Sequence, residues 1–437
     1  MSKNGNKAEK PVRAERKATF AGALIAFLLC VAVIMGGIVG LGLDAQTALV
    51  GAIIVMMVFG VCFLHIKFQD MVQAMVRSLN DSLECILILL VIGMLIASWM
   101  ACGTVPYIIY LGLGLLNPSW YLPFIVIMCS VLSSITGSSW TTIGTIGVAF
   151  IGISMGMGLP VPLTAGAIVC GAYFGDKCSP VSDIVVFNSG ITKQNVYKHA
   201  KNVLWTTVPA LVVSLVIFTV LGIRYSGIAM NQEGIDVIRN GLAANYHFSP
   251  VLWIPFIVLV VSIVLKVPAL ASLMFGCIAG LIVALIFQGD GVSAVLGFMW
   301  NGYSASTGLE SIDKILNRGG MTNMMYIIVL TSMSLAGLFD RTNLLLTIVA
   351  KFQRLTRTRV GLIVTTMVTG IITSFVCSDP YIAALVPVKV FEHEYEKQGL
   401  DVCVLSRTVS DGGICFAPMV PWGSNGVFCA TTLGITT

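Results

Sequence analysis

At least eight apolar stretches dominate this sequence, and each is long enough, or nearly so, to cross a lipid bilayer. A spanning helix needs about 20 predominantly apolar residues, because the hydrocarbon core is about 30 Å thick. Backbone groups inside lipid must be hydrogen-bonded within the segment, so these stretches form helices unless they alternate with period two, as barrel strands do. They do not alternate in this way. The stretches are 20–43, 47–64, 83–102, 203–222, 251–265, 270–287, 324–339 and 360–376.

The composition excludes the common classes of soluble protein. Charged residues make up 10% of the chain and hydrophobic residues 57%, whereas ordinary soluble domains contain about 25% charged residues. A wetted surface cannot hide that much apolar side chain, so a cytosolic enzyme, a disordered regulator and a nucleic-acid-binding protein are excluded. The sequence also lacks a phosphate-binding G-x-x-x-x-G-K-[ST] motif and a G-x-S-x-G nucleophile motif. We predict an all-α polytopic membrane protein that is not an enzyme and needs no cofactor.

Basic residues gather in three short segments, 1–17, 193–201 and 351–359, and the net charge is +5. Cytoplasmic loops of membrane proteins are enriched in Lys and Arg. We therefore predict a multi-pass protein of the cytoplasmic (inner) cell membrane with its N-terminus inside.

Several apolar segments are interrupted by polar, glycine-rich strings. Residues 123–135, 146–155 and 163–174 each look too short to span a bilayer, and the strings 136–145 and 175–183 separate them. Comparable strings of the second half are 377–381, 406–413 and 421–426. Interrupted hydrophobic segments at corresponding places in two halves indicate the binding site of a transporter. We therefore predict broken helices in both halves.

The two halves align weakly, which predicts an internal repeat. The matching pairs are Ile135 and Ile372, Ala97 and Ala336, and Cys170 and Cys415, which lie 237, 239 and 245 residues apart. All three basic segments fall on one side of the membrane only if two segments are re-entrant hairpins, an arrangement that also inverts the second half. The predicted organisation is a cytoplasmic basic segment (1–19), a first membrane half (20–222) with two leading helices, hairpin 121–157 and broken helix 163–191, an external linker (223–250), and a second membrane half (251–437) with hairpin 360–391 and broken helix 410–437. The second half ends soon after its last break, so we expect a partner for the helix 203–222 to be missing from this sequence.

Unwound backbone within a bilayer survives only where it lines a cavity or holds a ligand, because unpaired carbonyl and amide groups are costly there. Side-chain oxygens beside unwound carbonyls suit a dehydrated Na+, whereas the positive ends of half-helices suit a carboxylate. The competing interpretation is helix packing through small residues. The predicted Na+-binding residues are Ser138, Ser139, Thr141, Thr142, Asp176, Ser179, Asp183, Ser378, Asp379, Asp411, Ser424 and Asn425.

Carboxylates at membrane depth are rare and usually functional. A carboxylate that binds either Na+ or H+ makes the two ions compete for one site, which is the minimum chemistry of exchange. Asp176 is the leading candidate, and the alternatives are a structural ion pair, such as that of Asp176 with Lys177, or a helix cap at the membrane surface. If an organic solute is carried as well, the residues predicted to bind it are Lys177, Arg407, Trp140 and Trp422.

Three strings carry a resemblance to a known family: 136–145, the string Gly-Ala-Tyr-Phe-Gly-Asp-Lys-Cys-Ser-Pro-Val-Ser-Asp at 171–183, and 405–413 leading to Pro421-Trp422. With them, the chain resembles the NhaC family of Na+/H+ antiporters, within the ion transporter superfamily, over most of its length from about Phe20. The resemblance implies an inverted-repeat fold with a scaffold and a transport domain, in which hairpins and broken helices form the site and move in an elevator-like manner. Members of this family exchange Na+ for H+, exchange malate for lactate, or carry amino acids. The strings 377–381 and 423–425 depart from the family pattern, which leaves the transported species open.

We therefore predict a secondary active transporter that exchanges Na+ for H+. The alternative is a Na+- and H+-coupled transporter of an organic anion, of the malate and lactate type, or of an amino acid. A receptor or structural protein would instead have continuous helices and no central polar cavity. The predicted partners are Na+, H+ and the lipid bilayer, a small carboxylate or amino acid in the alternative, and a second copy in a homodimer, but no nucleic acid.

Overall fold

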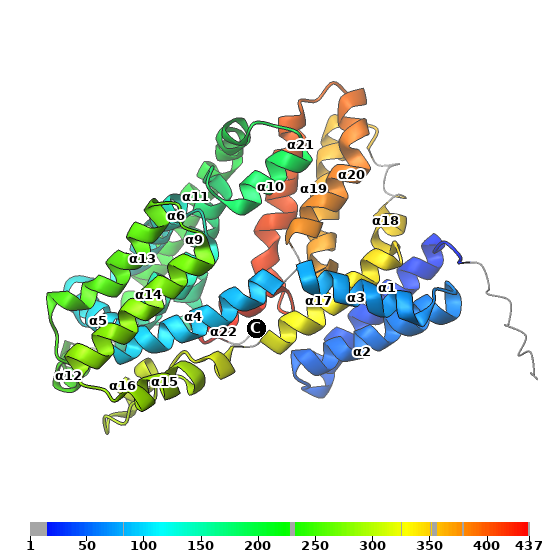
Figure 1. Ribbon diagram of the computed structural model, residues 1–437. Coiled ribbons are helices and arrows are strands. Elements are labelled where there is room, and N and C mark those ends of the chain that lie inside the picture. Colours follow the sequence, from blue (N-terminus) through cyan, green and yellow to red (C-terminus); the bar gives the residue numbers. More distant parts are fainter. Residues whose placement is uncertain are drawn as a thin grey trace, which may run out of the picture.

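The structure is a computed structural model, and it describes residues 15–81, 83–227, 232–324, 326–349, 351, 356–377 and 380–435. Every regular element within these ranges is helical (Figure 1), which confirms the predicted all-α architecture. The α-helices of the first half are α1 (Phe20–Met35), α2 (Ala45–Val58), α3 (Phe68–Asp81), α4 (Leu83–Ala101), α5 (Thr104–Leu115), α6 (Pro118–Thr136), α7 (Ser139–Thr142), α8 (Val148–Gly156), α9 (Val161–Cys178), α10 (Asp183–Ile191) and α11 (Val196–Ser226). Those that follow are α12 (Gln232–Asn245), α13 (Ile254–Val264), α14 (Ala269–Val283), α15 (Val292–Asn301), α16 (Glu310–Leu316), α17 (Tyr326–Arg341), α18 (Leu344–Val349), α19 (Arg359–Cys377), α20 (Pro380–Lys397), α21 (Val402–Val409) and α22 (Ser424–Leu433). Among the π-helical and 3-10 turns that extend them are η3 (Ile143–Gly147), η6 (Met321–Asn323), η8 (Ser410–Ile414) and η9 (Ala417–Met419).

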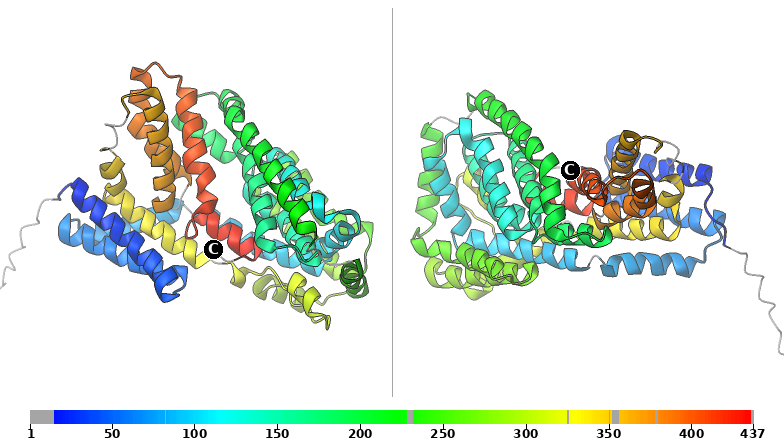
Figure 2. Two further views of the ribbon diagram at one scale, coloured as in Figure 1. Left: turned by 180° about the vertical axis from the view of Figure 1, so that it is seen from behind. Right: turned by 90° about the horizontal axis from the view of Figure 1, so that it is seen from above.

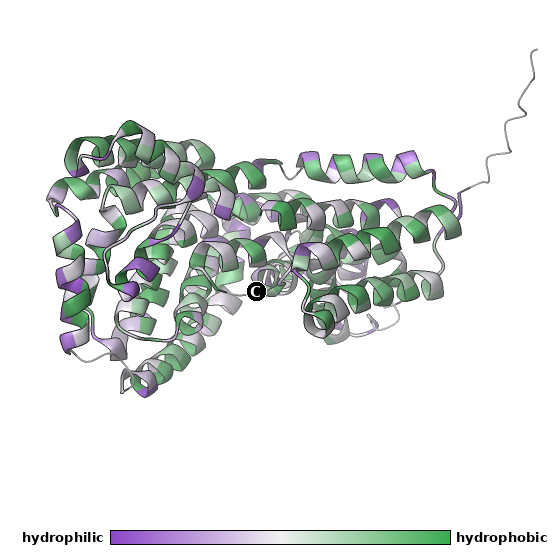
Figure 3. Cartoon of the chain, turned by 90° about the horizontal axis from the view of Figure 1, so that it is seen from below, coloured by the Kyte–Doolittle hydropathy of each residue, from purple (hydrophilic) through white to green (hydrophobic). Residues whose placement is uncertain are grey.

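Many of these helices suit a lipid environment. Within the described ranges, six are long and apolar enough to cross a membrane, or eight if each of two bent pairs forms one span. Figure 3 shows apolar residues along most of the helices, with hydrophilic residues gathered mainly at their ends and connections. The six are Phe20–Ile38, Ala45–Phe63, Pro118–Thr136, Ser139–Gly156, Val196–Ser226 and Ala269–Gln288. The protein is therefore a multi-pass membrane protein, as predicted.

The expectation that three mid-chain segments are too short to span is wrong for two of them. The helix α6 has 19 residues and the run Ser139–Gly156 has 18, and both are apolar enough to cross, whereas α9, with 18 residues, is not one of the six. Hydroxyl side chains continue these helices by bonding the carbonyl one turn back: Ser130 Oγ donates to Val126 O (2.6 Å) and Thr145 Oγ1 to Thr141 O (2.6 Å). Hydropathy treats such residues as breaks, although they keep helical backbone where the polar atom is satisfied locally.

The predicted linker 223–250 is largely helical and packed. It contains the end of α11 and the helix α12, which lies against α5. Leu242 and Tyr246 of this segment are buried. The described part of this segment is therefore folded against the rest of the protein and is not an open loop.

The first hairpin folds back at Gly137 and Ser138, between α6 and α7. Tyr121 near the start of α6 donates a hydrogen bond through its hydroxyl to the carbonyl of Phe150, 29 residues later. A straight helix would hold these residues about 40 Å apart, at 1.5 Å per residue. The chain therefore reverses its direction at the break.

The second hairpin consists of α19 and α20, which lie side by side (Figure 1). Arg359 at the start of α19 donates to the carbonyl of Gln398 just after α20 (3.3 Å), and Tyr395 donates to Thr366 (3.3 Å). These contacts make the two helices antiparallel. The predicted site residues Ser378 and Asp379, between the two helices, lie outside the described residues.

The two hairpin regions repeat along the chain at a spacing of 241 residues. Equivalent helices begin at Pro118 and Arg359, at Ser139 and Pro380, at Val161 and Val402, and at Asp183 and Ser424. We call residues 118–191 repeat 1 and residues 359–433 repeat 2. The sequence-based spacings of 237, 239 and 245 bracket this value, but the two pairs that fall within the repeats, those of Ile135 and Cys170, join residues that are not equivalent. Cys170, for example, corresponds to Asp411 and not to Cys415.

Packing inside the two repeats follows the same spacing. Ser133 on α6 donates to the carbonyl of Ala172 on α9 (2.5 Å), and Ser374 on α19 donates to the carbonyl of Gly413 in η8 (2.9 Å). Both residues of the second pair lie 241 positions after those of the first. The repeats therefore share the contact that joins each hairpin to its broken helix.

Contacts between the repeats are reciprocal. Trp140 of repeat 1 stacks on Phe428 of repeat 2, with ring centroids 4.3 Å apart. The equivalent residues make the exchanged contact, since Tyr381 of repeat 2 packs edge-on against Phe187 of repeat 1 at 5.0 Å. When two equivalent positions contact each other in both combinations across the repeats, the repeats are related by a two-fold axis. The inversion of this relation across the membrane remains a prediction.

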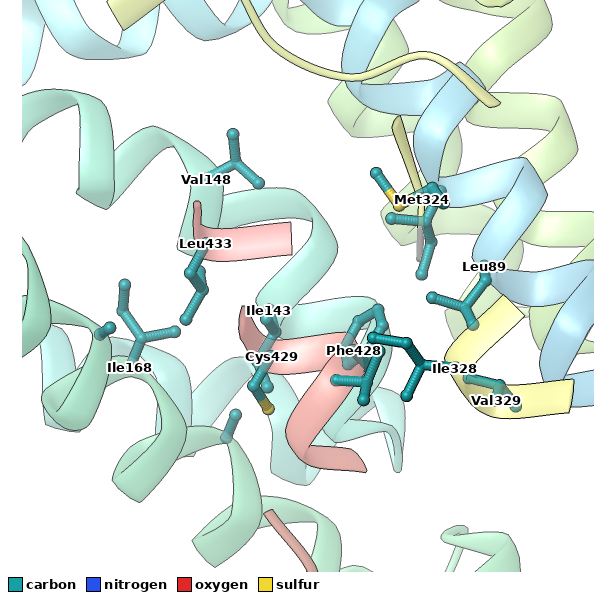
Figure 4. Packing of buried hydrophobic residues seen from close by; sticks show 14 of the residues in the cluster. Leu89, Ile143, Val148, Ile168, Met324, Ile328, Val329, Phe428, Cys429 and Leu433 are labelled. Atoms are coloured by element: carbon teal, nitrogen blue, oxygen red, sulfur yellow. The ribbon is translucent and has the colours of Figure 1, made fainter. Parts of the chain in front are cut away.

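The helix α22 lies at the centre of the molecule (Figures 1 and 2). Figure 4 shows its residues Phe428 and Leu433 among Ile143 and Ile168 of repeat 1 and Ile328 of α17. All of these side chains are buried in the main hydrophobic core. This packing fixes the beginning of α22, where the predicted site residues Ser424 and Asn425 lie.

Candidate functional site: a cavity between two broken helices

The site begins where the two breaks of repeat 1 touch each other. Gly137 adopts a left-handed conformation (φ +67°), and a Cβ atom there would lie 2.9 Å from Ser182 N and from Val181 C. Glycine is required because no other residue avoids both the strain and this close approach. The unwound backbone at Gly137–Ser138 is thereby held against the break Ser179–Ser182.

Asp176, in the last turn of α9, is surrounded by donors from both breaks. Its Oδ2 accepts hydrogen bonds from the Ser139 amide (3.2 Å) and hydroxyl (2.6 Å), and its Oδ1 accepts one from the Ser182 hydroxyl (2.6 Å). An ionised carboxylate has about four lone-pair positions, so these donors leave room for one further partner. A sodium ion or a proton can take that place, but not both at once.

Ser138 caps the helix that follows it. Its Oγ accepts hydrogen bonds from the Thr141 amide (3.2 Å) and hydroxyl (3.1 Å). Thr142 donates its hydroxyl to the Ser138 carbonyl (3.0 Å). The hydroxyls predicted from this string therefore organise the break itself, and Ser139 is the one that reaches Asp176.

Repeat 2 meets this region through the first turn of α22. Asn425 is buried, and its Oδ1 accepts hydrogen bonds from Trp140 Nε1 (2.7 Å) and from the Tyr173 hydroxyl (2.7 Å). Trp140 belongs to α7 and Tyr173 to α9. These bonds join the breaks of the two repeats, as the sequence analysis expected of a shared site.

Lys177 forms an ion pair with Asp411 of η8 and not with its neighbour Asp176. The Asp411 Oδ1 atom also accepts a hydrogen bond from the Thr206 hydroxyl (3.1 Å). Relative exposure is 7% for the Lys177 side chain and 22% for that of Asp411. The alternative of a local Asp176–Lys177 pair is therefore wrong, and Asp411 serves here as a counter-charge.

A cavity of about 580 Å³, which we call the central cavity, lies beside these groups. Buried residues on its wall include Ser139, Thr141, Lys177, Ser424 and Asn425. Exposed residues on its wall include Glu84, Val181, Asp183 and Lys266. The cavity thus reaches from the protein interior to one surface. Asp183 lies at this outer end, where its Oδ2 accepts a hydrogen bond from the Tyr381 hydroxyl (2.6 Å).

Five predicted site residues lie away from the wall of this cavity: Thr142, Ser179, Arg407, Asp411 and Trp422. Apart from Thr142 and Asp411, described above, they bond to nearby protein groups: Ser179 to the Ser134 carbonyl (2.8 Å), Arg407 to the Asn202 amide oxygen (3.4 Å) and Trp422 to the Phe375 carbonyl (2.8 Å). The structure therefore brings together Ser138, Ser139, Trp140, Thr141, Asp176, Lys177, Asp183, Ser424 and Asn425.

The breaks differ in position and length from the polar strings. Only Gly137 and Ser138 are unwound in the first string, and Asp176 and Lys177 remain helical. In repeat 2, the chain is helical through Phe416 and loses regular α-helix from Ala417 to Gly423, whereas the predicted break was 421–426. Glycine and serine read as breakers in sequence, but they stay helical where another helix packs closely on them.

The sequence analysis missed several residues of the site: Tyr173, Ser182, Tyr381, Glu84 and Lys266. Ser182 could have been found, because it lies in the same short string as Ser179 and Asp183. Glu84 and Lys266 could not, since they belong to α4 and to the α13–α14 connection, far from both breaks in sequence.

Comparison with known proteins places this site in context. Residues 171–437 match the model of the Na+/H+ antiporter family. The chain is 35% identical to the Na(+)/H(+) antiporter NhaC of Alkalihalophilus pseudofirmus, over 96% of this chain and 91% of that protein. It is 33% identical to the malate-2H(+)/Na(+)-lactate antiporter of Bacillus subtilis (97% and 90%) and 32% identical to the arginine/ornithine antiporter ArcD of Halobacterium salinarum (96% and 88%).

Proposed function

Because this chain belongs to the Na+/H+ antiporter family, we propose that it exchanges sodium ions for protons at the Asp176 carboxylate. The observation that carries this assignment is the position of Asp176 between two helix breaks, with three donors and one free lone-pair position. Na+ and H+ then compete for one group. A carboxylate that moves from one side of the membrane to the other with either ion carries out exchange.

The two repeats support a transport cycle through their unequal exposure. Val181 at the break of repeat 1 is 58% exposed, whereas its equivalent in repeat 2, Trp422, is 5% exposed. Likewise, Asp183 is exposed and its equivalent Ser424 is buried. In the proposed cycle, the repeats exchange these environments, so that the central cavity opens alternately to the two sides.

We place the protein in the cytoplasmic membrane with its N-terminus inside. The basic residues Lys193, Lys198 and Lys201 lie near the start of α11, and Arg357 and Arg359 near the start of α19. The positive-inside rule puts both groups in the cytoplasm. In this orientation the exposed end of the cavity, with Lys266, faces the cytoplasm.

Proteoliposomes with an internal pH dye test the function. Addition of NaCl outside should alkalinise the lumen, because Na+ enters in exchange for H+ that leaves, and Asp176→Asn should abolish this response while the protein still inserts and folds. Wild-type exchange by the variant would remove Asp176 from the mechanism. No sodium-driven pH change under any gradient would refute the function itself.

An organic solute as a further cargo is the second candidate, and the volume of the central cavity favours it. Cavities that bind small organic molecules have about 300–1,000 Å³, and this one has about 580 Å³, far more than a dehydrated cation occupies. The similar proteins include one named for malate and lactate and one named for arginine and ornithine. An absolute requirement for such a solute in the proteoliposome assay would support this candidate over simple exchange.

A further inference from the structure

Asn425 is held in one orientation by two side chains of repeat 1. Its Oδ1 accepts hydrogen bonds from Trp140 Nε1 and the Tyr173 hydroxyl, both at 2.7 Å. Trp140 is itself fixed, because its ring stacks on Phe428 with the ring planes 6° apart. The amide of Asn425 therefore cannot turn freely.

The indole of Trp140 decides which atom of this amide is the oxygen. Amide oxygen and nitrogen are hard to distinguish by shape, so their assignment depends on the hydrogen-bond partners. An indole N–H can only donate, so the atom opposite it must be the acceptor Oδ1. With a second donor from Tyr173, both lone pairs of Oδ1 are in use.

The nitrogen of the same amide is left for the central cavity. Asn425 lines that cavity, and its Nδ2 atom has no acceptor among the described residues. This nitrogen is not fully buried, so it is accessible from the cavity. Asn425 thus presents two N–H donors, which suit an anionic or carbonyl oxygen and repel a cation. This orientation argues against the predicted role of Asn425 as a Na+ ligand.

Further donors line the same cavity. Lys177 is buried there, and its ammonium group carries three donors, one of which is engaged by Asp411. The helix α22 begins at Ser424, and its N-cap residue is Gly423. The positive end of a helix favours negative charge. Asn425 and the start of α22 therefore offer donors to the cavity, whereas Asp176 offers a carboxylate.

We infer that Asn425 is a specificity-determining residue that binds the carboxylate of a small organic solute, while Asp176 binds the cation. This inference rests on the proposed function, because it places the solute in the same cavity. A small carboxylate and a dehydrated cation both fit within about 580 Å³. The donors of Asn425 and the carboxylate of Asp176 orient them.

The test compares Asn425→Asp with Asn245→Asp in the full-length protein. Asn425→Asp keeps the oxygen that accepts from Trp140 and Tyr173 but replaces the two donors with a negative oxygen. Asn245→Asp makes the same chemical change at an exposed position of α12, away from the cavity. The probes are the proteinogenic amino acids and the mono- and dicarboxylates of two to five carbons, with binding to purified protein measured by calorimetry in NaCl.

We expect at least one probe to bind the wild type, and its dissociation constant to rise about tenfold or more in Asn425→Asp but not in Asn245→Asp. The amide derivative of that probe should bind the wild type poorly, and the preference for carboxylate over amide should disappear in Asn425→Asp. A purely structural role would change stability without changing this preference.

Trp140→Phe is a second variant that keeps the stacked ring but removes the indole donor. The freed amide can then turn, so the preference for carboxylate over amide should weaken several-fold. Unchanged affinity and preference in both variants would overturn the inference, as would the absence of binding by any probe to wild-type protein that exchanges Na+ for H+. In the second case the proposed exchange function would stand, because it is measured separately in proteoliposomes.

Discussion

The ion pair between Lys177 and Asp411 links the two repeats, and its removal gives a quantitative prediction. Breaking a buried pair by removing one partner costs about 3–5 kcal/mol, because the other charge is left uncompensated. For Lys177→Met we expect the free energy of unfolding to fall by the lower end of this range, about 3 kcal/mol, because Asp411 is 22% exposed and keeps its hydrogen bond from the Thr206 hydroxyl. For Asp411→Leu we expect about 4 kcal/mol, because Lys177 is more deeply buried.

The double variant Lys177→Met/Asp411→Leu removes both charges, so its free energy of unfolding should lie within about 1 kcal/mol of that of the wild type. With an unfolding entropy of about 2.1 cal/mol/K per residue, 3 kcal/mol corresponds to a fall of about 3 °C in the melting temperature of a chain this size. Tryptophan fluorescence during heating in detergent, at one fixed rate, measures these shifts. The control is Lys314→Met, which removes an exposed pair with Glu310 and should change stability by less than about 1 kcal/mol. If the double variant is destabilised by the sum of the two single effects, the two charges do not stabilise one another and the reasoning is refuted.

Two further substitutions test particular contacts. Gly137→Ala forces a side chain into a left-handed conformation and against Ser182 N, so transport should be lost and the free energy of unfolding should fall by about 1–2 kcal/mol. The control is Gly190→Ala, because a Cβ atom at Gly190 meets nothing within 4 Å. Full transport by Gly137→Ala would show that the breaks need not touch. The pKa of Asp401, which lies in the loop before α21, is lowered from its ordinary 3.8, chiefly by the backbone N–H of Cys403. The stabilising contribution of Asp401 is therefore present above pH 3.8 and is lost as the pH falls through the lower folded-state pKa. Asp401→Ala should lower the free energy of unfolding by about 1 kcal/mol at pH 7. If the two proteins still differ by this amount well below pH 3, the assignment is contradicted.

Sequence patterns predicted the spans of the molecule well because hydrophobicity and length determine them. The stretch 83–102 became α4, and 360–376 became α19, with ends shifted by only a residue or two. The breaks of repeat 1 were found in the right strings but were drawn too long, whereas the break at Ala417–Gly423 in repeat 2 begins before its predicted string. Gly175 shows why: it stays helical because it packs against the backbone of Ser134 on α6, a contact that depends on tertiary structure.

Partners far apart in sequence could not be predicted. Lys177 was considered with its neighbour Asp176, but its partner Asp411 lies 234 residues away. The orientation of Asn425 depends on Trp140 and Tyr173, which are 285 and 252 residues distant. The spacing of 241 residues emerged only from the helix boundaries, because the two repeats share a fold but few residues.

Equilibrium binding of radioactive sodium at a series of pH values tests most directly whether Asp176 is the group for which Na+ and H+ compete. Wild-type protein and Asp340→Asn, a change to an exposed aspartate in α17, should bind Na+ progressively less tightly as the pH falls. Asp176→Asn should bind none at any pH while retaining its fold. Sodium binding by Asp176→Asn with the affinity and pH dependence of the wild type would contradict the account.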